Sequence, residues 1–419
     1  MKAKWFKWVL SLVLVLSPLG LNLFADNAKV IIDTFPDLFI DQMIHALQKA
    51  GLADKAEIRT VPQNQYESKL KLTIASGDVG DVICMDAPNI AYYADAGALE
   101  PLEAYWDKGD FNDLVGSARS AMTWNGKIWA APLNESNCVL WYNKDMFKAA
   151  KLTAPTKLSE AWTVDQLLQA AIKLTKKDSS GKTTVYGILP QMFSSDTRNE
   201  GMSYTQMLWT WWFGGDILSK DGKTAKGYFD SPASKQALHF YQDLFQKYGV
   251  APAVPISGGF EAERIAMWIT GPWMIGEWKN HFPDFYKANK WGAMPLPKGV
   301  AAASNSGSWN LAISRQSKNK QLAWQVVQGI TGKDGAYVYC SETGNLPARQ
   351  SVLDKTDMSK PPFTIIKEQL VQSARCRPVT PVYPQITYPL MDCFNAVALG
   401  EAVDKAVSDA VGKMERALK

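Results

Sequence analysis

Two carboxylates lie next to a group of tryptophans near the middle of the chain. Glu261 and Glu263 in "FEAERIAMW" come shortly before Trp268. A pair of acids beside aromatic rings is what glycoside hydrolysis requires. Acids two positions apart on a strand share one face, however, whereas the two acids of a glycosidase reach the sugar from opposite sides and come from separate elements. The spacing therefore favours surface charge over catalysis.

The residue patterns of other enzymes are missing. His45, His239 and His281 are far apart in the sequence, and neither H-E-x-x-H nor G-x-S-x-G occurs. The tripeptide GKT occurs at 181–183 and 222–224, but both copies lack the upstream glycine of a phosphate-binding loop. We therefore expect a protein that is not an enzyme and that uses no cofactor and no metal.

The tryptophans favour a binding function. Trp268, Trp273 and Trp278 in "AMWITGPWMIGEW" are five apart, and on a helix such steps rotate each side chain by about 140°, so the three cannot share one buried face. Trp273 and Trp309 each stand beside glycines where a strand or helix is expected to end. Aromatic rings at the ends of elements line binding clefts, and an indole covers the apolar face of a sugar ring.

Other tryptophans are expected in the core. Trp162, Trp268 and Trp324 stand among apolar residues on regular elements, so we predict that they are buried. The segment "YTQMLWTWWFGGDIL" cannot turn all its indoles the same way. We predict that Trp211 or Trp212 reaches the cleft.

Strands alternate with helices in the first part of the chain. "KVIIDTF" predicts a strand, "PDLFIDQMIHALQKAG" a helix, "YESKLKLTIASGD" a second helix and "DVICM" a second strand, which together predict a mainly parallel α/β sheet. Asn125 and Gly126 between apolar runs predict a hairpin turn. Longer helices follow from 132 to about 293, and no flexible linker divides the 419 residues. We expect two lobes that share several crossings.

The N-terminus predicts export. Lysines precede an apolar run that Pro18 interrupts, and a cleavage site after Ala25 fits a signal peptide over 1–25. The first cysteine is Cys84, so no cysteine near the cleavage point is available for a lipid anchor. A soluble periplasmic protein is expected.

Charge and cysteines set further bounds. The chain holds 45 basic and 41 acidic residues, and the first 25 residues contain three of the lysines and no acid. The remaining net charge of about +1 argues against a nucleic-acid partner. Cys340, Cys376 and Cys393 are close enough in sequence to offer one disulfide, whereas Cys84 and Cys138 read as small buried apolar residues.

Motifs along nearly the whole chain beyond the first 25 residues resemble one family. "LWYNKDMF", "GPWM" and "NLPAR", in this order and with "DVICMDAP" before them, resemble the extracellular solute-binding proteins of family 1. These are maltose-binding-protein-like sugar receptors of ABC importers. The resemblance implies an α/β fold of the two-lobed periplasmic binding protein class (type II-like), with a ligand cleft between the lobes.

The resemblance also implies boundaries and cleft residues. Crossings are expected near 131–132, 294–297 and 337–341. The N-terminal lobe would comprise 26–131 and 294–337, and the C-terminal lobe 132–293 and 338–419. The cleft residues implied are Phe35, Asp37, Asp86, Asn89, Asn134, Glu135, Ser136, Trp273, Trp309, Tyr383 and Arg349, of which Arg349 could equally form a salt bridge.

The function implied is capture rather than conversion. A monomer would bind an oligosaccharide, close about its hinge and deliver the sugar to permease subunits in the inner membrane. Two alternatives stay open. One is a receptor for a non-sugar solute such as a glycerophosphodiester, for which Arg349, Arg375 and Arg377 could supply positive charge. The other is a secreted glycoside hydrolase.

Overall fold

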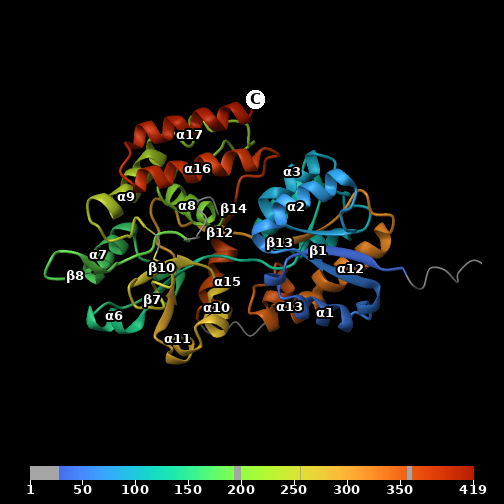
Figure 1. Cartoon of the computed structure of the whole chain (residues 1–419), viewed down its shortest axis with the longest axis horizontal. Coiled ribbons are helices and arrows are strands. Elements are labelled where there is room, and N and C mark those ends of the chain that lie inside the picture. The colour runs from blue at the N-terminus through green and yellow to red at the C-terminus, as the bar shows by residue number, and fades with distance from the viewer. Residues whose placement is uncertain (1–27, 193–199, 255, 356–360) are drawn as a thin grey trace, which may run out of the picture.

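The computed structural model describes residues 28–192, 200–254, 256–355 and 361–419, which form two α/β lobes side by side (Figure 1). The two-lobed fold predicted from the sequence is confirmed. The predicted signal peptide over 1–25 lies outside the described residues. Within the described ranges, no helix is long and apolar enough to cross a membrane.

The N-terminal lobe is built on a five-stranded sheet in the order β2-β1-β3-β13-β6. Its strands are β1 (Val30–Thr34), β2 (Ala56–Thr60), β3 (Val82–Asp86), β6 (Ala131–Pro132) and β13 (Trp309–Ile313). β1 runs parallel to β2 and β3, while β13 runs antiparallel to β3 and β6. This register sets the carboxyl end of β3 beside the start of β13, which brings two predicted site residues together.

Helices cover this sheet, and the predicted strands and helices of the first part of the chain are present. Asn125 and Gly126 form the turn of the predicted hairpin, β4 (Thr123–Trp124) and β5 (Lys127–Ile128), and both have positive φ. The helical segments of this lobe are η1 (Pro36–Leu38), α1 (Ile40–Lys49), η2 (Ala53–Lys55), α2 (Gln63–Ser76), η3 (Ala87–Asn89), α3 (Ile90–Asp95), α4 (Lys108–Asn112), α5 (Gly116–Met122), α12 (Lys320–Thr331), α13 (Lys333–Thr343) and α14 (Gln350–Leu353).

The C-terminal lobe has a smaller sheet, which is antiparallel. The sheet order is β10-β7-β11, with β7 (Val139–Asn143) between β10 (Met267–Thr270) and β11 (Trp291–Met294). A hairpin joins β8 (Lys176–Lys177) and β9 (Thr183–Val185). The helices are α6 (Lys144–Ala149), η4 (Leu158–Glu160), α7 (Val164–Leu174), α8 (Glu200–Trp212), α9 (Pro232–Gln246), α10 (Met274–His281), α11 (Pro283–Ala288), α16 (Tyr383–Ala398) and α17 (Val403–Ala417). α16 and α17 lie together along its outer edge (Figure 1).

Three segments cross between the lobes. The first joins β6 to β7. The second runs through β12 (Ser304–Ser306) and the third through β14 (Ala374–Cys376), which follows α15 (Phe363–Gln372), and these two strands pair in parallel.

Two predicted crossings are wrong, and the lobe boundaries shift with them. Met294 and Leu296 are buried in the core of the C-terminal lobe, so the chain leaves that lobe later than 294–297. The segment 337–341 lies inside α13, which packs against α1, and the Tyr339 hydroxyl donates a hydrogen bond to the Leu38 carbonyl. Residues 338–353 therefore pack with the N-terminal lobe, because the apolar face of α13 is needed to cover α1.

A buried amide holds the crossings together. Gln369 of α15 donates from Nε2 to Asn137 Oδ1 at 2.6 Å and to the Cys138 carbonyl at 2.8 Å. Its Oε1 accepts from the Leu296 backbone N–H at 2.8 Å. Because buried polar groups are costly when unpaired, these bonds fix how the hinge segments lie against one another.

The core predictions were met only in part. Trp324 is buried as predicted, whereas Trp162 and Trp268 are half-buried, because each lies at the edge of its core. All five cysteines are free, so no disulfide joins Cys340, Cys376 and Cys393, and Cys84 and Cys138 are buried. Burial raises the pKa of the Cys84 thiol to about 12.

Candidate functional site

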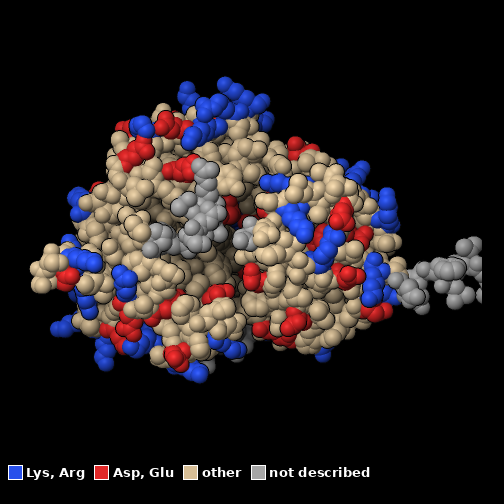
Figure 2. Space-filling view, viewed as in Figure 1, with Lys and Arg blue, Asp and Glu red and all other residues tan. Residues whose placement is uncertain are grey.

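An arginine joins the two lobes. Arg377, directly after β14, donates to Asp86 at the end of β3, from Nη2 to Oδ1 at 2.5 Å and from Nη1 to Oδ2 at 2.9 Å. Nη1 also donates to Glu200 Oε1 at the start of α8, at 2.9 Å. Only 5% of the Arg377 side chain is exposed. One guanidinium therefore binds a carboxylate of each lobe, and Figure 2 shows the surface hollowed between the lobes.

Glu200 collects further hydrogen bonds from the C-terminal lobe. The hydroxyl of Tyr383, at the start of α16, donates to Glu200 Oε1, and Thr387 Oγ1 donates to Oε2 at 2.8 Å. Tyr383 is fully buried. Its ring is therefore packed into this network rather than standing free in the cleft.

Two aromatic rings extend the network toward the hinge and the cleft. The Arg377 guanidinium lies over the Tyr204 ring at 5.1 Å, and the Tyr204 ring lies 6.3 Å from the half-buried indole of Trp273. The Tyr204 hydroxyl bonds with Ser136 at the first crossing. We call the group Asp86, Arg377, Glu200, Tyr204 and Trp273 the interlobe site.

A second indole lies on the N-terminal lobe. Trp309 is directly opposite Asp86 in the pairing of β13 with β3. Its half-buried ring meets the buried Phe35 edge-on at 4.6 Å between centroids, and its backbone N–H donates to Asn134 Oδ1. Phe35 thus supports Trp309 from beneath.

Electrostatics at the interlobe site depend on burial. Burial raises the pKa of Asp86, and the adjacent Arg377 opposes that rise. A buried charge is tolerated when it is paired and hydrogen-bonded, which Arg377 provides for both carboxylates. With one cation for two carboxylates, the site attracts no anion.

Glu135, at the first crossing, is fully buried. Its Oε1 accepts from the Ser306 hydroxyl at 2.6 Å, whereas Oε2 has no hydrogen-bond partner among the described residues. Burial raises the pKa of Glu135 to about 8. The carboxyl group is therefore largely protonated at neutral pH.

This burial makes stability depend on pH. The unfolded carboxyl loses its proton near its ordinary pKa and the folded one near 8, so the unfolded state binds fewer protons between these values and stability falls as the pH rises. We expect the free energy of unfolding to fall between pH 6 and pH 8 by about 2 kcal/mol more in the native chain than in Glu135→Gln. Urea unfolding at both pH values measures this. Glu57→Gln, at an exposed position, should behave like the native chain, and an identical fall in Glu135→Gln would contradict the assignment.

Four predicted cleft residues have other roles or positions. Trp212 is fully buried and donates from Nε1 to the Ala303 carbonyl, and Trp211 is buried beneath Arg375, so neither reaches a cleft. Arg349 is 1% exposed and binds both oxygens of Asp110 within the N-terminal lobe. Asp37 is exposed on η1. Their local sequence could not reveal which partners the fold would bring.

The remaining predicted residues lie near the hinge. Asn89, on η3, is half-buried, and η3 contacts α16 of the other lobe. Asn134, Glu135 and Ser136 lie on the first crossing, and Ser136 Oγ donates to the Gly307 carbonyl at 2.7 Å. Their contact with a ligand stays a prediction.

The sequence matches the model of a known protein family. The model described as bacterial extracellular solute-binding protein matches residues 28–337. The chain belongs to this family. Its members bind solutes, so the interlobe site is the natural candidate for the solute-binding position of this solute-binding protein.

Individual relatives are also binding proteins by name. A binding protein of Brucella abortus is 24% identical over 99% of both chains. The maltotriose-binding protein of Pyrococcus abyssi is 23% identical, over 81% of this chain and 71% of that one. The structure of an ABC transporter solute-binding protein from Thermotoga lettingae, bound with alpha-D-tagatose, superposes with a TM-score of 0.79 at 27% identity, over 94% of this chain and 100% of that one.

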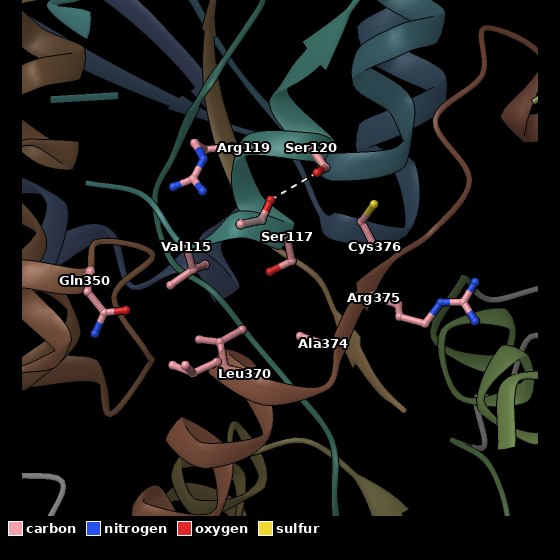
Figure 3. Close-up of a pocket in the computed structure, with 11 residues that line it drawn as sticks. Val115, Ser117, Arg119, Ser120, Gln350, Leu370, Ala374, Arg375 and Cys376 are labelled. Carbon is pink, nitrogen blue, oxygen red and sulfur yellow. Dashed lines mark hydrogen bonds between the residues drawn. The ribbon is translucent and has the colours of Figure 1, made fainter. Parts of the chain in front are cut away.

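A cavity of the solute-binding protein lies away from the interlobe site. This cavity has a volume of about 680 Å³ and lies between α5 on one side and α15 and β14 on the other (Figure 3). None of the predicted cleft residues lines it. Figure 3 shows Arg375 turned away from its centre, consistent with the ion pair of 2.6 Å between Arg375 and Asp216.

The glycine before Trp273 makes room for its indole. A Cβ atom on Gly271 would lie 1.9 Å from Cζ3 of Trp273, so the ring folds back over Gly271. We expect Gly271→Ala to displace the indole and weaken solute affinity by about tenfold, or 1.4 kcal/mol. Titration calorimetry measures the affinity. Gly276→Ala is the matched control, because its Cβ would meet Phe39 only at 4.0 Å, and equal affinities for both variants would contradict the expectation.

Sequence reasoning missed two residues of the interlobe site. Glu200 and Tyr204 lie in the first turns of α8, before Trp209, Trp211 and Trp212 on the same helix. Arg377 was considered only as a charge for an anionic solute. The spacing of four residues between Glu200 and Tyr204 predicts that the two side chains are neighbours on one helix face. It does not predict which residues they contact across the cleft.

Proposed function

We propose that this solute-binding protein is the periplasmic receptor of an ABC importer and captures an uncharged carbohydrate between its lobes. The observation that supports this most is the Arg377 guanidinium, which joins Asp86 of one lobe to Glu200 of the other beside Trp273. Carboxylates and a guanidinium in one place offer acceptors and donors to sugar hydroxyls, and indoles cover the ring faces.

Capture would proceed by closure. A sugar that contacts Trp309 on one lobe and Trp273 on the other binds the closed form better than the open form, and only that difference shifts the population. Closure excludes water and strengthens the polar contacts. The loaded monomer would then dock on permease subunits. Export would remove residues 1–25.

An uncharged solute is favoured over a glycerophosphodiester. Each of the three arginines considered for an anion already has a carboxylate partner: Arg349 binds Asp110, Arg375 binds Asp216 and Arg377 binds Asp86. An anionic solute would have to break one of these pairs. The proposal therefore ranks neutral sugars first.

Binding is also favoured over hydrolysis. Glu261 accepts from Trp278 Nε1 at 2.6 Å, and Glu263 pairs with Lys290 at 2.8 Å. Both carboxylates of the sequence motif are thus engaged in contacts within their own lobe. This supports a receptor rather than a glycosidase.

A thermal-shift screen of residues 26–419 tests the proposal. D-tagatose, maltotriose, longer maltodextrins and sn-glycero-3-phosphocholine would be compared, because relatives are named for or bound with the first two classes of sugar. A solute that binds the folded state raises the melting temperature by mass action. We expect a sugar to do so and to be recovered intact. A sugar recovered cleaved, or a shift with the phosphodiester alone, would overturn the proposal.

A further inference from the structure

Six exposed basic side chains gather at one end of the C-terminal lobe, where the end of α17 meets the loop 219–227. They are Lys220, Lys223, Lys226, Lys413, Arg416 and Lys419. Figure 2 shows Lys and Arg atoms clustered at the top of the molecule, above the end of α17 that carries the C-terminus in Figure 1. We call these six residues the basic tip.

The basic tip is held together by a carboxylate beneath it. Glu415 Oε1 accepts from Thr224 Oγ1 at 2.7 Å and from the backbone N–H groups of Ala225 and Lys226 at 2.6 and 3.0 Å. These bonds fix the lysine-bearing loop against α17. The clustering is therefore a feature of the fold, although its two halves lie almost 200 residues apart in sequence.

The acids beside the tip, Asp221, Asp392 and Glu415, are fewer than its six cations. Asp221 is engaged by the Ser219 hydroxyl and the Lys223 backbone N–H, and Asp392 lies 3.9 Å from Lys413. In the described ranges, the other five cations of the tip form no ion pair. The chain beyond residue 25 has a net charge of about +1, so the tip concentrates positive charge on a nearly neutral molecule.

The composition of the tip fits a lipid surface better than a protein surface. Five of its six cations are lysines, which are depleted in protein interfaces, whereas arginine is enriched there. A lysine is a mobile point charge suited to many phosphate positions. Tyr228, in the following turn, is 37% exposed, and tyrosine is favoured at the boundary between membrane and water.

We propose that the basic tip docks on anionic phospholipid headgroups at the membrane surface. Each lysine or arginine near an anionic bilayer strengthens binding about fivefold, and the effect falls off within a Debye length. A protein docked in this way diffuses along the membrane surface, so it searches for a membrane-embedded partner in two dimensions. That use depends on the proposed importer role, whereas vesicle binding is measured without sugar or permease.

Vesicle flotation tests the proposal. The chain 26–419 is mixed with vesicles of phosphatidylcholine alone or of phosphatidylcholine and phosphatidylglycerol at equal parts, at about 50 mM salt. We expect binding to the anionic vesicles only, lowered more than tenfold at about 500 mM salt. Lys220→Glu/Lys223→Glu/Lys413→Glu should lower the partition coefficient by more than about 100-fold.

A matched variant separates location from net charge. Lys49→Glu/Lys108→Glu/Lys318→Glu makes the same charge change at exposed positions of the N-terminal lobe and should bind anionic vesicles at least ten times better than the tip variant. Circular dichroism and an unchanged thermal shift with the sugar hit establish that both variants fold. Equal loss in both variants, or no binding of the native chain at low salt, would overturn the proposal. Docking on an acidic protein face would give that last result.

Discussion

Arg377→Met should lower the free energy of unfolding by about 3 kcal/mol at pH 7, because it leaves the partly buried carboxylates of Asp86 and Glu200 without their shared cation. Removing one partner of a buried ion pair costs more than the pair is worth, since the remaining charge loses its compensation. Urea unfolding of the chain 26–419 measures the loss. The loss should shrink as the pH falls, because burial raises the pKa of Asp86 and protonation then neutralises the stranded Asp86 carboxylate.

The neighbouring arginine is the matched control. Arg375 is 41% exposed and pairs with Asp216 at the surface, so Arg375→Met should cost about 1 kcal/mol or less. Asp86→Asn combined with Arg377→Met should recover part of the loss, because one stranded charge is then absent. Equal stability of the two arginine variants would mean that Arg377 is not the central contact between the lobes.

The second large effect is expected on binding. Trp273→Ala should weaken affinity for the sugar found in the screen by about 2 kcal/mol or more, roughly 30-fold, because a half-buried indole beside Tyr204 and the Arg377 network is placed to cover a ring face. Stability should change less than affinity, since the ring is only partly buried. Titration calorimetry measures the affinity.

A second tryptophan of the same lobe provides the control for truncation. Trp162 is also half-buried, but it stacks on Phe147 at 5.9 Å between ring centroids. Trp162→Ala should lower stability and leave sugar affinity within about twofold. If Trp273→Ala is folded and binds as tightly as the native chain, the indole does not contact the sugar.

The two predictions separate the roles of the interlobe site. Arg377 carries the contact between the lobes through charge, whereas Trp273 offers a surface to a solute. Since Tyr204 touches both, a variant such as Tyr204→Phe changes the bond to Ser136 without removing the ring. The Tyr204 side chain therefore links the interlobe site to the first crossing segment through its hydroxyl group.

Much of the fold was predictable from local patterns. The apolar run "VIIDT", the helix after it and the hairpin at Asn125 and Gly126 follow from periodicity and turn chemistry, which act over a few residues. The Gly-Pro pair at the end of β10 likewise places Trp273 directly before α10. These features fix which segments become strands and helices.

The boundaries between the lobes were not predictable in this way. α13 has the pattern of an ordinary helix, and nothing in it states which lobe it covers. The packing of α13 against α1 decides which lobe α13 joins. The apolar surfaces of both helices must be buried, and the chain can reach either lobe.

The sequence by itself determined a two-lobed α/β protein with Trp273 and Trp309 at the ends of elements, because periodicity and turn residues act locally. Only the tertiary structure decided which arginine serves the site. Arg349 and Arg377 are both almost fully buried, yet the first binds Asp110 inside one lobe and the second binds Asp86, 291 residues away, and Glu200, 177 residues away. A buried charge must find its counter-charge in space, and the distance along the chain does not limit where that partner comes from.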